Sequence, residues 1–116
     1  MNLYHVMIDL KDDAKALVFA KVLDDWLSYL QAADKIGTWR LLRRKLGLGS
    51  TAHGDFVLEI EVDGLAQLDE AFRHASAQSD DVDRLYYPVH QLIARAEVGI
   101  YRPFPDDSRA ERVAIL

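Results

Sequence analysis

The 116-residue sequence contains no cysteine, which excludes disulfides, cysteine-ligated zinc and thiol catalysis. It also contains no apolar run of the roughly 18 residues that a membrane-spanning helix needs. Its N-terminus lacks the basic start and the long apolar core of a signal peptide. We therefore expect a cytoplasmic protein that has no membrane partner.

Positive charge is in the minority, with 14 Lys and Arg against 19 Asp and Glu and a formal net charge of −5. Nucleic-acid binding normally needs a basic surface, so we expect no nucleic-acid partner. Half of the residues are hydrophobic, which is typical of a globular chain and too many for a disordered one. A chain of this length is expected to form a single domain with one core.

Four segments have the patterns of strands. Hydrophobic residues alternate along residues 2–10 and 55–62, which is the two-residue period of a strand. Residues 38–46 precede a glycine-rich connection and form a predicted hairpin with 55–62. The adjacent Leu41 and Leu42 break the alternation in 38–46 and predict a β-bulge there. Residues 95–102 are the last predicted strand.

Helical spacing of apolar residues predicts helices over residues 14–33 and 65–75. Asp12 or Asp13 is the predicted N-cap of the first helix. A further helical piece starts at Ser79, and Pro88 is expected to kink or divide it because proline has no backbone N–H.

The order strand, helix, strand, strand, helix, strand is the ferredoxin-like order of an α+β fold. It predicts an antiparallel sheet with helices on one face, a single domain over residues 1–102 and a C-terminal tail over 103–116. The helix-free face would combine apolar with charged side chains, which suits a face that meets its counterpart in a second copy. Its predicted residues in the first and third strands are Leu3, His5, Met7, Asp9, Val57, Glu59 and Glu61.

Five short segments carry a family resemblance: NLYH at 2–5, WRL at 39–41, RRKLGLG at 43–49, LAQLD at 65–69 and YRPFPD at 101–106. Over residues 2–102 the chain resembles the dimeric α+β barrels, in which two ferredoxin-like subunits bring their sheets together. More closely, it resembles a small uncharacterised bacterial family within that architecture, from which it departs by Pro103 in place of an acidic residue. The resemblance implies a homodimer but no activity, since the wider architecture includes cofactor-free monooxygenases, isomerases, haem-handling proteins and ligand sensors.

The candidate site lies on the predicted helix-free face. The expected sheet order brings His5 near Glu59 and Tyr101. A histidine beside a carboxylate can act as a general base, while tyrosine and arginine can hold a substrate oxygen. We therefore select His5 as the catalytic candidate and Arg43, Glu59, Tyr101 and Trp39 as ligand-binding candidates.

Several features of these segments allow more than one interpretation. The expected bulge leaves open which of Arg40, Arg43, Arg44 and Lys45 faces the barrel interior. Cross-strand pairing with Glu59 or Glu61 is a simpler explanation for the basic residues of this strand than an anion-binding site. Trp39 and the pair Tyr86 and Tyr87 either belong to the core, which is the simpler expectation, or line a cavity between sheet and helices.

Metal and phosphate sites are not predicted. The histidines are spread over the chain, and Glu70 and His74 share a helix face without a third ligand at a recognisable spacing. The glycine-rich segment 47–54 joins two strands, whereas phosphate loops lead into a helix. No cofactor is expected.

Three functions remain open at this stage. The favoured one is a homodimer that binds a small organic molecule in a cavity beside the sheet. The second is a cofactor-independent monooxygenase or isomerase with His5 as general base. The third is a purely structural dimer whose charged inner face is fully salt-bridged. Whether the protein is an enzyme is left undecided.

Overall fold

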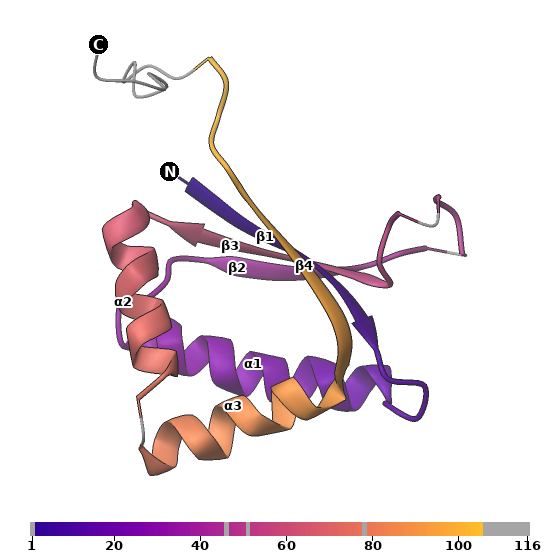
Figure 1. The fold of residues 1–116 in the computed structure, drawn as a ribbon, viewed down its shortest axis with the longest axis horizontal. Helices are drawn as coiled ribbons and strands as arrows, with labels where there is room; N and C mark the ends of the chain where they lie inside the picture. Colours follow the sequence, from indigo (N-terminus) through magenta and orange to yellow (C-terminus); the bar gives the residue numbers. More distant parts are fainter. Residues whose placement is uncertain (1, 46, 51, 78, 106–116) are drawn as a thin grey trace.

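A computed structural model describes residues 2–45, 47–50, 52–77 and 79–105. The elements follow in the order β1 (Asn2–Leu10), α1 (Ala16–Ala32), β2 (Trp39–Arg43), β3 (Phe56–Val62), α2 (Leu65–Ala75), α3 (Asp80–Leu92) and β4 (Ile93–Tyr101). The strands form one antiparallel sheet in the order β2-β3-β1-β4. The three helices lie on one side of it (Figure 1). The predicted ferredoxin-like α+β fold is confirmed.

The core lies between the sheet and the helices. Alternate residues of β1 and β3 enter it, so that Ile8 and Val62 are each only 2% exposed. From α1, Phe19 is fully buried and its ring lies 5.4 Å from that of Phe56. The prediction of which residues of these two strands face the helices and which face away from them is therefore confirmed.

The predicted bulge in the second strand is wrong. Residues 39–43 of β2 pair with β3 in an unbroken register, in which Leu41 opposes Leu58 and Leu42 opposes Val57. The adjacent leucines therefore lie on opposite faces, and Leu42 is simply exposed on the helix-free side. The register shift in the described sheet lies elsewhere, between Asp9 and Leu10 where β1 pairs with β4.

Two helix predictions also need correction. The N-cap of α1 is Lys15, which makes no side-chain capping bond. Asp12 and Asp13 form a turn before it and lie too early to cap the helix. Of the two outcomes expected at Pro88, a kink or a division, the division is wrong, because α3 continues from Asp80 to Leu92 as one helix. From residue 106 onward, the predicted tail lies outside the described residues.

Candidate functional site

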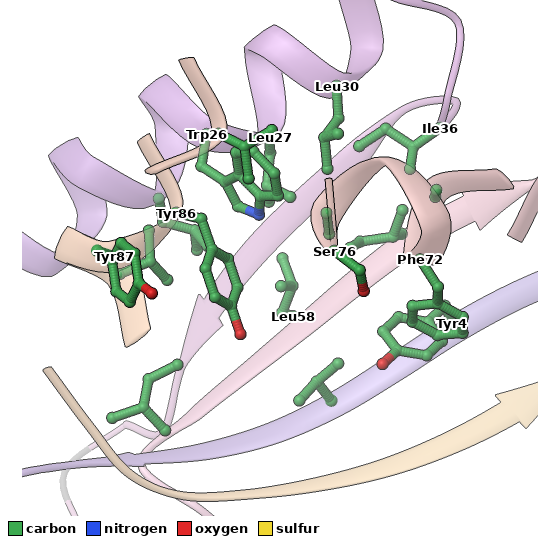
Figure 2. Close-up of a pocket in the computed structure, with 18 of the residues that line it drawn as sticks. Tyr4, Trp26, Leu27, Leu30, Ile36, Leu58, Phe72, Ser76, Tyr86 and Tyr87 are labelled. Carbon is green, nitrogen blue, oxygen red and sulfur yellow. The ribbon is translucent and has the colours of Figure 1, made fainter. Parts of the chain in front are cut away.

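A cavity of about 830 Å³ lies between the sheet and the helices (Figure 2). Its walls come from β1, β3, all three helices and the start of β4, and they are mostly aliphatic or aromatic. They include Val6 and Ile8 of β1, Leu23, Trp26 and Leu30 of α1, Leu58 and Ile60 of β3, Leu68, Phe72 and Ala75 of α2, and Val82, Tyr86 and Val89 of α3. Tyr86 and Tyr87 thus line the cavity, the second of the two expectations for them, whereas Trp39 is not among the described residues that line it.

Uncharged polar groups enter this apolar space. Figure 2 shows the hydroxyls of Tyr4, Ser76 and Tyr86 directed into the cavity from β1, the end of α2 and α3. Tyr86 Oη also lies 3.5 Å from His90 Nδ1. Burial raises the pKa of Tyr4, and the nearby Tyr86 hydroxyl raises it further. The Tyr4 hydroxyl therefore keeps its proton at neutral pH and can donate it to a hydrogen bond.

An aromatic cluster fixes one wall of the cavity. The ring of Trp26 stacks on Tyr29 at 5.9 Å between centroids and meets the edge of Tyr86 at 5.5 Å. Tyr29 Oη in turn lies 2.7 Å from Nε2 of His74 on α2. These contacts join α1, α2 and α3 and hold the Trp26 indole in one orientation.

The helix-free face brings three of the five predicted site residues together. His5 opposes Glu59 in the register, and its ring meets Tyr101 edge-on at 5.6 Å. Glu59 is already engaged, because Arg40 Nε lies 2.6 Å from its Oε1. Arg40 is thus a basic residue that lies on this face, and its cross-strand pairing is the arrangement expected for the basic strand.

Arg43 and Trp39 do not join that group. The register places both on the helix side of β2, where Arg43 opposes Phe56 and Trp39 opposes Ile60. The Arg43 guanidinium lies 5.6 Å from the centre of the Phe56 ring. The predicted grouping fails because β2 has no bulge. Its side chains therefore alternate regularly between the two faces of the sheet, and Arg43 and Trp39 lie on the face opposite His5. At the sheet edge, Trp39 shares a groove of about 350 Å³ with Arg40 and Glu59.

None of the five predicted site residues lines the large cavity. Tyr4 belongs to the alternating pattern of residues 2–10 and Trp26 to the helical apolar pattern of residues 14–33, and neither was among the predicted site residues. The sequence does contain a signal for these two residues. Each side chain carries a polar atom, and the hydrophobic pattern places that side chain in the interior. Ser76 has no comparable signal.

The described residues contain no group of three His, Asp or Glu placed to hold a metal ion. Within the same part of the chain, no helix is long and apolar enough to cross a membrane.

The fold and this interior cavity define a small ferredoxin-like α+β protein. The chain belongs to a family of unknown function, DUF6614, which it matches over residues 1–116. No curated protein matches it.

Solved structures share the fold at low sequence identity. One protein of Arabidopsis thaliana superposes with a TM-score of 0.70 and 8% identity, covering 89% of this chain and 95% of that one. A dimeric ferredoxin-like protein of unknown function from Thermobifida fusca gives 0.56 and 19%, covering 87% and 90%. Hydroxynitrile lyase from Passiflora edulis gives 0.65 and 13%, covering 86% and 90%.

Proposed function

We propose that this protein binds a small, predominantly apolar organic molecule in the cavity between the sheet and the three helices. The cavity itself carries the proposal. Its volume of about 830 Å³ falls within the range of roughly 300–1,000 Å³ that is usual for ligand pockets. Ligand pockets also combine apolar walls with a few oriented polar groups, as Tyr4, Ser76 and Tyr86 provide here.

The apolar walls argue in the same direction. The space is partly open to solvent, so water can enter it. A ligand that displaces this water from side chains such as Leu23 and Val82 gains the free energy of removing apolar surface from water.

Paired substitutions on α2 test the proposal. Ala75 lines the cavity, whereas Ala66 is exposed on the same helix. The protein should raise the fluorescence of the uncharged dye N-phenylnaphthylamine. Ala75→Trp should weaken this binding by about tenfold, equivalent to about 1.4 kcal/mol, because the indole fills the space. Ala66→Trp is the control and should bind as the parent does. Equal affinities for all three proteins would contradict the proposal.

A reaction with His5 as general base is the second candidate. His5 lies on the helix-free face and does not line the cavity, so such a reaction would need a separate site beside Tyr101 and Glu59. The Passiflora lyase is an enzyme, but its 13% identity does not carry its activity to this chain. Ligand binding is therefore the better supported function.

We also propose that two copies meet through the helix-free face. Leu42, Val57 and Met7 form an apolar row across β2, β3 and β1, and none of the three helices in the described residues covers it. Apolar rows left open to water favour a partner surface. The Thermobifida fusca neighbour is described as dimeric. Sedimentation at micromolar concentration should give about twice the chain mass of 13.2 kDa. Detection of the monomer alone would overturn this proposal.

A further inference from the structure

We infer that the cavity takes an uncharged ligand with a carbonyl oxygen, and that this oxygen accepts a hydrogen bond from the indole N–H of Trp26. The inference rests on the proposed function and narrows its ligand class. It depends on three features of the cavity, which are an unpartnered donor, a set of adaptable hydroxyls and the absence of cations from the described walls.

The unpartnered donor is the Trp26 indole nitrogen. Trp26 is only 6% exposed, yet its N–H makes no hydrogen bond with the part of the chain that the structure describes. The nitrogen is not sealed inside the protein, since the described side chains include no enclosed polar atom without a partner. Figure 2 shows it on the cavity side of the ring. An indole N–H can only donate, so the acceptor at this position comes from the cavity, either water or an oxygen atom of a bound ligand.

The hydroxyls of Tyr4 and Ser76 are also without a hydrogen-bond partner among the described residues, and both point into the same space. Tyr86 Oη has one long contact, at 3.5 Å, to His90. A hydroxyl can donate or accept, so these groups can also hydrogen-bond the ligand oxygen that accepts from the Trp26 N–H.

The charges exclude an ionised ligand. No Lys, Arg or His lies among the described residues that line the cavity, and the only ionisable carboxyl there belongs to the exposed Asp83. A carboxylate ligand would lose its hydration without gaining a cation, which is far more costly than burying a neutral carbonyl that finds a donor. An ammonium group would leave the Trp26 donor unused.

Three naphthalenes of similar shape test this assignment: acetylnaphthalene, the hydrocarbon isopropenylnaphthalene and naphthoate. We expect the ketone to bind roughly three- to tenfold more tightly than the hydrocarbon, which is the usual net effect of one hydrogen bond. Naphthoate should bind less tightly than the ketone. Trp26→Phe keeps an aromatic ring and removes the N–H. It should abolish the advantage of the ketone while the affinity for the hydrocarbon stays within about twofold.

A measurement without substitution of Trp26 covers the case in which Trp26→Phe does not fold. In a Trp39→Phe background, Trp26 supplies the one indole N–H proton resonance, because the chain has two tryptophans. The ketone should move this resonance downfield and the hydrocarbon should move it less. Equal binding of ketone and hydrocarbon, or no downfield shift with the ketone, would overturn the inference and leave the proposed function intact. If neither compound binds, the proposed function itself fails.

Discussion

The two faces of the sheet are built by the same strands but have opposite chemistry. Toward the helices, β1 and β3 present apolar side chains that are nearly all buried, and the polar atoms among them are uncharged. Toward the other side, the apolar row of Leu42, Val57 and Met7 lies beside a polar row of Arg40, Glu59 and His5. The two-residue period of a strand thus gives one sheet two independent surfaces.

The electrostatic difference between the faces is informative. Uncharged donors such as the Trp26 N–H can be kept in an apolar interior until a ligand accepts from them, whereas an unpaired charge there would be very costly. On the helix-free face, Glu59 is only 16% exposed and is paired with Arg40. The covered face is therefore suited to a neutral small molecule, and the helix-free face to a partly wet contact with another protein surface.

The largest expected effect contrasts two consecutive residues of β3. Phe56 is buried against Phe19, so Phe56→Ala should lower the free energy of unfolding by about 3–5 kcal/mol. Val57 points to the helix-free face, and Val57→Ala should cost about 1 kcal/mol or less in the monomer. Urea denaturation of the two variants measures both values.

The dependence on protein concentration is a second way to distinguish the stability losses of Phe56→Ala and Val57→Ala. If a second copy covers Val57, the loss in Val57→Ala should grow as the protein concentration rises, while the loss in Phe56→Ala should not depend on it in that way. Equal losses in the two variants at low concentration would mean that the helix-free face is as tightly packed as the core within one chain.

An intermediate effect is expected from a charge in the apolar row. Met7→Asp would place a carboxylate between Val57 and Glu97, its neighbours in the register. Burying that unpaired charge between two copies should weaken association roughly hundredfold, or about 2.8 kcal/mol. Leu17→Asp is the control, because Leu17 is 86% exposed on α1. Sedimentation equilibrium measures both variants, and unchanged association in Met7→Asp would place the contact elsewhere.

Much of the fold could be predicted because alternation and helical spacing are set by backbone geometry. The faces of β1 and β3 were predicted correctly, and α2, predicted from Leu65 to about Ala75, spans Leu65–Ala75. The error in β2 has a physical cause, since the adjacent Leu41 and Leu42 were interpreted as a break in the alternation that needs a bulge. An apolar residue can equally lie on a second face, and the sequence alone does not show what covers that face.

The site was harder to predict than the fold. The proximity of His5 and Tyr101 follows from strand order, and the structure brings them together. A cavity, in contrast, results from how side-chain volumes fill the space between elements, and no periodicity encodes it. Trp26 occupies an ordinary core position in the helical pattern, so only the packed structure reveals that its N–H has no partner in the described part of the chain.

The smallest expected effect is a pH dependence that tests whether the cavity is an apolar environment. Burial, with a further contribution from Tyr86, raises the pKa of Tyr4 in the folded protein. The folded state therefore holds the phenolic proton more tightly than the unfolded state, in which a tyrosine titrates near pH 10. The resulting stabilisation is fully present below about pH 10 and is lost as the pH rises through the folded-state pKa.

Tyr4→Phe removes this ionisation and keeps the ring that packs edge-on against Phe72. In urea denaturation from pH 8 to pH 11, the free energy of unfolding of the parent should therefore fall relative to that of Tyr4→Phe once the pH exceeds about 10. Tyr101→Phe makes the same chemical change on the helix-free face and supplies the baseline for comparison. Parallel curves for the parent and Tyr4→Phe would mean that the Tyr4 hydroxyl is hydrated as well in the folded protein as in the unfolded chain. The cavity would then be wet, and a ligand would gain little there from a hydrogen bond that water already supplies.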